Sequence, residues 1–365
     1  MGLARYFAAD HVSAIAEIGT SHGGDRSRAR ELIDAAAEAG ADCIKTQIVY
    51  ADEIVHPKTG AVELPGGAVP LFERFRELEV APDFFAEMAE HCLSRGVAFL
   101  ASCFGPRSLR VLTEIGLDTV KIASPELNHA PLLRLVREAG LAAILSTGVS
   151  TLSDIERAVS VTGQSDTAIM HCVTAYPAPE EDYNLRVIGN LAAVMGLPVG
   201  VSDHSLDPVL VPAAAVALGA RAVEKHFTLS QAGGGLDDRI ALEPAQFSEM
   251  VAGIRDVEHR PSAEALHELG RRFGEDRVRR LLGDGAKRLA PSEQANYGRS
   301  NRSILATRDI AAGEPIGDDN AAALRSEKNL EPGLSPFHWD DIRGARAARG
   351  IADGTGIRWE HLLAR

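Results

Sequence analysis

From residue 13 onward, short apolar runs alternate with longer stretches in which apolar residues recur at helical spacing. The stretch 26–38, for example, places apolar residues at 29, 32, 33 and 36, which together form one face of a helix. The runs with the character of buried strands lie at 14–18, 42–48, 98–102, 119–123, 142–146, 168–173, 199–202 and 222–225. Strands that alternate with helices in eight consecutive units predict a (β/α)8 barrel. A doubly wound sheet is the main alternative, but it seldom needs eight such units.

The same pattern divides the chain into three parts. Residues 1–258 carry the barrel pattern, and residues 259–300 are charged and helix-prone without a ninth strand, which indicates a linker or arm. Residues 301–365 combine short strands with many turns and predict a small β-rich domain, which we expect to pack on another surface because so small a core is marginally stable. An insertion at 52–80 contains HPKTGAVELPGGAVP, which is too rich in Gly and Pro for a helix. We expect it to be a loop that covers the substrate site.

Composition narrows the possible partners and compartment. The 365-residue chain has a formal net charge of -13, which argues against a nucleic-acid or anionic-membrane partner. Its four cysteines are widely spaced with no CxxC pair, a pattern typical of reduced thiols. The N-terminus lacks the apolar run of a signal peptide, and no stretch is long enough to span a membrane. We therefore expect a cytoplasmic protein.

Several conspicuous side chains are expected to be structural. Cys103 and Cys172 lie near strand ends, where we expect small core residues rather than nucleophiles. Trp339 and Trp359 are expected to form the core of the C-terminal domain. The basic stretch 343–349 is interpreted as a solvated or subunit-facing surface, given the acidity of the whole chain.

Polar side chains follow nearly every predicted strand, at the end of the barrel where (β/α)8 enzymes place their chemistry. Two lysines with several hydroxyls predict a site for a phosphorylated, carboxylated anion. Carboxylates add acid–base capacity, and two strand-end histidines invite a divalent metal, although two ordinary rim histidines are the alternative. The strand-end residues are Glu17, Lys45, Gln47, Ser102, Lys121, Ser124, Glu126, Ser146, Tyr176, Ser202, His204 and His226.

At these positions the sequence resembles the sialic acid (N-acetylneuraminate) synthase family. The matching segments are AEIGTSHGGD (16–25), IKTQ (44–47), VKIASPE (120–126), LSTG (145–148), YPAP (176–179), SDH (202–204), EKHFT (224–228) and LDDRIALEP (236–244). They occur in the family's order and cover the whole predicted barrel. The tail from Asn301 is similar, more loosely, to the family's C-terminal antifreeze-like (SAF) domain.

The resemblance implies condensation of phosphoenolpyruvate with an N-acyl-hexosamine-type aldose, giving a nine-carbon 2-keto-3-deoxy acid and phosphate. It also implies a homodimer in which the SAF domain covers the neighbouring subunit's site, and a divalent metal cofactor, for which we expect Mn²⁺, with Mg²⁺ and Co²⁺ as alternatives. The residue roles follow by matching position: Lys45, Lys121, Ser124, Ser146 and Ser202 hold phosphoenolpyruvate, with Ser102 and Gln47 nearby; His204 and His226 bind the metal; Glu126 handles protons; Glu17, Tyr176 and Asp237 contact the sugar.

Three departures from the family pattern fall on the acceptor side. Ser21 replaces the usual asparagine before His22, and Asp238 and Ala241 replace a usual histidine and serine near Asp237. The tail reads NLEPG at 329–333 and so lacks the usual arginine before Pro-Gly, and the nearest upstream arginine, at position 325, is not assigned that role. We therefore expect the donor chemistry to be retained, while the acceptor sugar stays open.

Other functions remain to be distinguished. A related synthase could use a different aldose or aldehyde, for example in a specialised sugar or natural-product pathway. Another phosphoenolpyruvate-condensing barrel, such as an aldoheptulosonate synthase, is disfavoured by the tail and by the SDH and EKHFT motifs. A non-catalytic carbohydrate- or partner-binding homologue is disfavoured because both lysines, Glu126 and both histidines are present.

Overall fold

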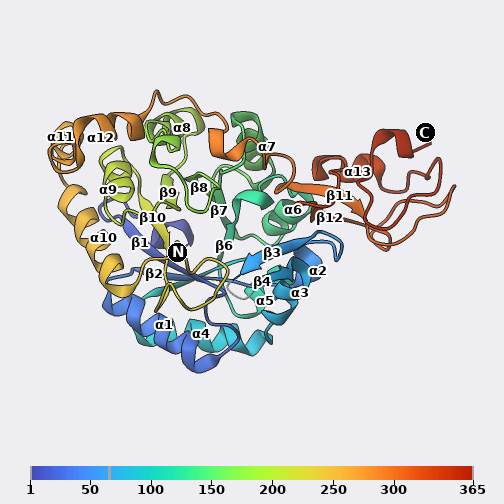
Figure 1. The fold of residues 1–365 in the computed structure, drawn as a ribbon, viewed down its shortest axis with the longest axis horizontal. Coiled ribbons are helices and arrows are strands. Elements are labelled where there is room, and N and C mark those ends of the chain that lie inside the picture. The colour runs from blue at the N-terminus through green and yellow to red at the C-terminus, as the bar shows by residue number, and fades with distance from the viewer. Residues whose placement is uncertain (1, 65–66, 364–365) are drawn as a thin grey trace.

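The computed structural model describes residues 2–64 and 67–363. Eight parallel strands form a closed barrel in the order β1-β10-β9-β8-β7-β6-β5-β2 (Figure 1). The predicted (β/α)8 barrel is therefore confirmed, and each predicted run overlaps one strand. The strands are β1 (Ser13–Gly19), β2 (Cys43–Gln47), β5 (Ala98–Ser102), β6 (Thr119–Ile122), β7 (Ala142–Ser146), β8 (Thr167–Cys172), β9 (Val199–Asp203) and β10 (Ala222–His226).

Strand register brings the predicted site residues to one end of the barrel. Glu17 of β1 pairs with His226 of β10 on one side and with Lys45 of β2 on the other. Ser102 of β5 lies opposite Gln47 of β2 and also opposite Lys121 of β6. Because the strands are parallel, these side chains all lie near carboxyl ends.

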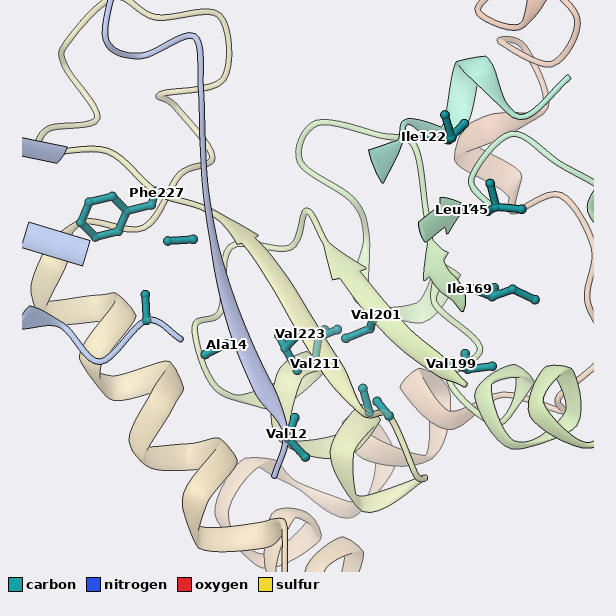
Figure 2. Close-up of a cluster of buried hydrophobic side chains, with 14 of the residues drawn as sticks. Val12, Ala14, Ile122, Leu145, Ile169, Val199, Val201, Val211, Val223 and Phe227 are labelled. Carbon is teal, nitrogen blue, oxygen red and sulfur yellow. The ribbon is translucent and has the colours of Figure 1, made fainter. Parts of the chain in front are cut away.

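The helices that follow the strands cover the outside of the barrel. Their apolar faces pack on the outward-facing strand residues, and Figure 2 shows part of this core, with Val201 and Val223 of neighbouring strands near Val211 of α9. These helices are α1 (Arg26–Glu38), α4 (Pro82–Ser94), α5 (Pro106–Glu114), α6 (Ala130–Glu138), α7 (Leu152–Thr162), α8 (Val187–Met195), α9 (Leu210–Ala217) and α10 (Pro244–Val257).

A second apolar cluster fills the inside of the barrel. Ile15, Leu100 and Met170 point inward from their strands and pack with Tyr6 and Phe7, which follow the short 3-10 helix η1 (Gly2–Arg5). The Tyr6 hydroxyl donates to the carbonyl of Phe99 at 3.0 Å. The polar residues at the carboxyl ends of the strands therefore lie next to a packed apolar barrel interior.

The insertion after β2 is more ordered than the expected loop. It contains α2 (Ala51–Ile54), a hairpin of β3 (Ala61–Leu64) and β4 (Gly67–Pro70), and α3 (Leu71–Glu77). Helix α3 forms because the sequence after Pro70 is apolar at helical spacing, and this spacing buries Phe75. Residues 65 and 66 of the insertion lie outside the described residues. Its role as a substrate-covering loop stays a prediction.

The segment expected to be a linker or arm is packed on the barrel over most of its length. It forms α11 (Ser262–Phe273), which lies beside α9, and α12 (Glu275–Leu282), which lies beside α11 and the 3-10 turn η3 (Glu180–Asp182) at the edge of the barrel (Figure 1). Leu269 and Val278 belong to the same buried cluster as the barrel helices. Residues 283–301 then cross to the C-terminal domain and include the 3-10 turn η4 (Pro291–Glu293).

The C-terminal domain is the predicted small β-rich domain. Strands β11 (Arg302–Ala306) and β12 (Ala321–Arg325) pair antiparallel, and α13 (Trp339–Ile342) lies near them at the right of Figure 1. Trp339 is buried in the core of this domain, as predicted. The prediction for Trp359 is wrong, because its side chain is 52% exposed and contacts the ring of His338 at the surface.

In the described part of the chain, no helix has the length and apolar character needed to cross a membrane.

Candidate active site

Two lysines and two carboxylates form a buried ionic network at the carboxyl end of the barrel. The Lys121 ammonium donates to both carboxylate oxygens of Glu224, at 2.8 and 3.0 Å. Lys45 lies 2.7 Å from Glu17 and 3.7 Å from Glu224. All four side chains are buried. Glu224 was missed by the sequence analysis, although it lies two residues before His226 and therefore on the same face of β10.

The network sets the charge state of its members. Burial works against the charged form of Glu224, but Lys121 and Lys45 outweigh it and lower the pKa of this carboxyl. Burial also opposes the Lys45 ammonium, yet Glu17 and Glu224 together raise the pKa of Lys45. Burial is the largest effect on Lys121, and because the nearby Lys45 opposes the attraction of the shared Glu224, the pKa of Lys121 is lowered. A bound anion would therefore stabilise the charged form of Lys121 more than that of Lys45, whose charge is already compensated.

Two of the predicted hydroxyls touch this network. Ser102 accepts a hydrogen bond from Lys45 at 3.3 Å, and Ser202 donates to Glu224 at 3.1 Å. Ser124 lies on the neighbouring loop, where its oxygen accepts from the amide of Gly148 at 3.0 Å. The Ser146 hydroxyl is buried and has no hydrogen-bond partner among the described residues. A substrate oxygen at this end of the barrel would give that hydroxyl a partner.

The two predicted metal-binding histidines lie side by side. The ring centroids of His204 and His226 are 5.5 Å apart, and the Tyr176 ring lies 4.3 Å from that of His204. The His204 Nδ1 lies 2.8 Å from the carbonyl oxygen of Val173. Because a carbonyl only accepts, Nδ1 carries a hydrogen and Nε2 is the nitrogen left for a metal ion.

Protonation and a metal ion would compete for these rings. Burial lowers the pKa of His226, which favours its neutral, ligating form. At His204 burial is opposed by Cys172, whose sulfur lies 3.8 Å from Nδ1, and by the Val173 carbonyl, and the pKa rises to about 9. A divalent metal would therefore have to displace a proton from His204 but not from His226, and its other positions would go to water or substrate. Across residues 2–64 and 67–363, no cluster of three or more His, Cys, Asp and Glu side chains forms a complete metal site.

Two predicted sugar-side carboxylates, Glu17 and Asp237, converge around Gly19 with Gln47, which was predicted to lie near phosphoenolpyruvate. Gln47 donates to Glu17 at 2.8 Å, and Asp237 lies 3.9 Å from Nδ1 of His226. A Cβ atom on Gly19 would lie 3.3 Å from the Gln47 amide nitrogen, 3.6 Å from the Glu17 carboxylate and 3.9 Å from the Asp237 carboxylate. Tyr176, whose ring lies 4.3 Å from that of His204, is 53% exposed. The predicted residues of these strands therefore lie close together at one end of the barrel, and Glu126 is an exception.

Glu126 lies apart from the lysine network. Its carboxylate binds two arginines of the C-terminal domain, Arg302 and Arg325, with Nε of Arg325 at 3.0 Å. Burial opposes the charged form of Glu126, but the two arginines outweigh it and lower the pKa of this carboxyl. Glu126 thus fastens the C-terminal domain to the barrel in this arrangement. Its predicted role in proton transfer stays a prediction.

Cys103 and Cys172, which were predicted to be core residues, are both buried. Burial raises the pKa of the Cys103 thiol far above its usual range, which suits the predicted core role. Cys172 packs behind the ring of His204 and is likewise buried.

Comparison with known proteins agrees with this geometry. The sequence model of the NeuB family matches residues 32–264, and that of the SAF domain matches residues 301–363. The spore coat polysaccharide biosynthesis protein SpsE of Bacillus subtilis is 37% identical over 358 residues, which are 96% of this chain and 94% of SpsE. Its solved structure superposes with a TM-score of 0.81 at 34% identity, covering 98% of this chain and 99% of that one. The N,N'-diacetyllegionaminic acid synthase of Legionella pneumophila is 31% identical over 361 residues, 96% of this chain and 94% of the enzyme.

Proposed function

Because this chain belongs to the NeuB family and carries a SAF domain at its C-terminus, we propose that it is a phosphoenolpyruvate-dependent sugar acid synthase. It would join phosphoenolpyruvate to an N-acyl-hexosamine-type aldose and release phosphate, giving a nonulosonic 2-keto-3-deoxy acid. The observation that carries the proposal is the buried network in which Lys45 and Lys121 share the Glu224 carboxylate, with Ser102 and Ser202 in contact. The named relatives support it, since one of them is a legionaminic acid synthase.

The lysine network is the proposed donor site. Lys45 and Lys121 would hold the carboxylate and phosphate of phosphoenolpyruvate, with hydroxyl donors from Ser124, Ser146 and Ser202. Carbon 2 becomes oxocarbenium-like when carbon 3 attacks the aldehyde, and water then adds there and phosphate leaves. Fixed ammonium and hydroxyl groups in a buried site stabilise the charge that develops on the leaving phosphate without having to reorganise.

His204 and His226 are the proposed ligands of a divalent metal, Mn²⁺ or alternatively Mg²⁺ or Co²⁺. When bound, such an ion supplies Lewis-acid polarisation of the aldehyde oxygen. The protein's own contribution is orientation: the Val173 carbonyl fixes the His204 ring through Nδ1, and the Tyr176 ring packs against it at a tilt of 33°. The neighbouring lysine network would place the donor within reach of the same space.

The acceptor would lie against Glu17, Tyr176 and Asp237. Tyr176 is the exposed member of this set, and Asp237 lies 3.9 Å from Nδ1 of His226, so a sugar bound there would contact both solvent and the proposed metal ligands. Ser21 and Asp238 depart from the family pattern near Asp237, so a different aldose or aldehyde acceptor, in a specialised sugar or natural-product pathway, is the second candidate.

We propose Glu126 as the group that takes a proton from the attacking water. Both its oxygens are bound to arginines in the present arrangement, so Arg302 or Arg325 would have to release its bond before Glu126 accepts a proton.

We also propose a homodimer in which the C-terminal domain covers the partner subunit's site. A monomeric, fully active species in analytical ultracentrifugation would refute the dimer.

The composition supports the proposals that the protein binds neither nucleic acid nor membranes and that it is cytoplasmic. A net charge of -13 disfavours nucleic acid and anionic membranes as partners, and free buried thiols are typical of a cytoplasmic protein.

Phosphate release from phosphoenolpyruvate with a panel of acceptors tests the proposal. With Mn²⁺ present, we expect release only when an N-acylated aldose is added. Release with unacylated sugar phosphates alone would favour the aldoheptulosonate type, and no release with any aldose would leave only the non-catalytic, carbohydrate- or partner-binding alternative.

A further inference from the structure

Glu293 enters the barrel face from the segment that leads to the C-terminal domain. Its side chain is 1% exposed, and one carboxylate oxygen accepts from the amide of Val149 at 2.6 Å and from the amide of Thr174 at 2.8 Å. The other oxygen accepts from the amide of Ala290 at 3.1 Å. One carboxylate from outside the barrel thus joins the ends of two adjacent barrel strands, β7 and β8.

The loop that Glu293 binds, residues 146–150, is held in a strained conformation. Val149 has φ +41°, which is costly for a β-branched residue and persists only where its surroundings fix it. Glu293 holds the Val149 amide, and Asn301 donates to the Val149 carbonyl at 3.1 Å. Lys287 donates to the Thr147 carbonyl at 2.8 Å. Three side chains of residues 283–301 therefore fix the backbone of this loop.

The same loop carries one hydroxyl of the proposed donor site, that of Ser146, and binds a second, that of Ser124 on the neighbouring loop. Ser146 is its first residue, and the amide of Gly148 donates to the Ser124 hydroxyl. A Cβ atom on Gly148 would lie 2.0 Å from the Thr174 hydroxyl, 3.0 Å from that of Ser124 and 3.1 Å from the Glu293 carboxylate. Such close packing means that a shift of the loop moves both serines.

We propose that Glu293 is a positioning residue for the phosphoenolpyruvate site: by binding the Val149 and Thr174 amides it fixes the 146–150 loop and thereby the Ser146 and Ser124 hydroxyls. The inference rests on the proposed function, because it takes these hydroxyls as donor ligands. Glu293 itself does not touch the substrate. With Glu293 in this role, residues 283–301, which connect the barrel to the C-terminal domain, also influence the affinity for phosphoenolpyruvate.

Three substitutions separate this role from a merely structural one. Glu293→Ala leaves the buried amides of Val149, Thr174 and Ala290 without an acceptor, so we expect the KM for phosphoenolpyruvate to rise about tenfold or more, since small misplacements of binding groups carry large costs. The KM for the aldose should stay unchanged. Glu293→Gln should keep the KM for phosphoenolpyruvate near the wild-type value, because its amide oxygen can still accept from Val149 and Thr174 and only the Ala290 amide loses its acceptor. Glu314→Ala is the matched control, since Glu314 caps the Ala311 amide at 2.8 Å within the C-terminal domain.

Hydrogen exchange of the 146–150 amides gives a readout that does not depend on turnover. Exchange should accelerate in Glu293→Ala and not in Glu293→Gln. An unchanged KM for phosphoenolpyruvate in Glu293→Ala, or an equal rise in both KM values, would overturn the proposal. If Glu293→Ala does not fold, Glu293→Asp, which is too short to reach both amides, takes its place. A wild-type protein without turnover would count against the proposed function alone, and calorimetric titration of the same variants with phosphoenolpyruvate would then decide the role of Glu293.

Discussion

The Ser21 hydroxyl donates a hydrogen bond to the carboxylate of Asp238 at 2.7 Å. These are two of the positions at which the chain departs from the pattern of the family it resembles, and the bond makes them one structural unit. It links the loop after β1 to the loop after β10. Asp238 also accepts from the amide of Gly235 at 2.7 Å and is buried, so it organises the loop that carries Asp237 toward His226.

Replacing Asp238 should therefore affect the acceptor and spare the donor. In Asp238→Ala the Gly235 amide and the Ser21 hydroxyl both lose their acceptor, and we expect the KM for the aldose to rise about tenfold. Steady-state kinetics with each substrate varied in turn checks this. A rise in the KM for phosphoenolpyruvate of the same size would show that the unit is not specific to the acceptor side.

Removing the shared counter-charge should destabilise the substrate-free protein. Glu224→Gln leaves Lys45 and Lys121 buried with less compensation, and breaking a buried ion pair typically costs about 3–5 kcal/mol. We expect the free energy of unfolding to fall by that order, and phosphoenolpyruvate to stabilise the variant more than the wild type. Denaturant unfolding with and without the ligand measures both effects.

A surface pair provides the control for this variant. Glu268→Gln removes the partner of Arg271 at an exposed site, where the expected cost is about 0–1 kcal/mol. An equal loss of unfolding free energy in the two variants would contradict the role of Glu224 as the buried counter-charge that Lys45 and Lys121 share.

Acid should weaken the contact between barrel and C-terminal domain. The pKa of Glu126 is lowered in the folded protein by Arg302 and Arg325, which outweigh the effect of burial. Its contribution to stability is therefore complete above the ordinary carboxyl pKa of 4.5 and is lost as the pH falls below that value. We expect the difference in unfolding free energy between wild type and Glu126→Gln to be constant near neutral pH and to shrink below pH 4.5. A difference that grows with acid would have the wrong sign.

The two histidines should be required for metal binding. We expect His204→Ala and His226→Ala each to lose Mn²⁺ affinity in calorimetric titration and to lose metal-dependent turnover. His91→Ala is the control, because His91 pairs with Asp34 on the outside of the barrel. Full activity of either site variant in chelated buffer would contradict the assignment.

Much of the barrel could be predicted because its signal is local. Each buried strand is a short apolar run, and each run stops at a polar residue on the same edge of the sheet, as at Gln47, Ser146 and His204. Strand-end chemistry of this kind follows from the topology alone. Glu224 could have been added by the same logic, since residues two apart on a strand share a face.

Other features depend on tertiary placement and left no such signal. Glu293 reaches Val149 only because the preceding helices α11 and α12 carry the chain around the barrel, which no short-range periodicity encodes. The exposure of Trp359 likewise depends on where the last turn of the C-terminal domain docks. The pairing of Glu126 with the two arginines joins segments far apart in sequence.

The most direct test of the central claim is the product formed from phosphoenolpyruvate labelled with ¹³C at all three carbons. Incubated with Mn²⁺ and an N-acylated hexosamine, the wild-type protein should give a labelled sugar acid extended by the three carbons of the donor, with one phosphate released per product. Mass spectrometry and a phosphate assay on the same sample measure both. Phosphate release without a labelled sugar acid, or neither with any aldose, would contradict the account.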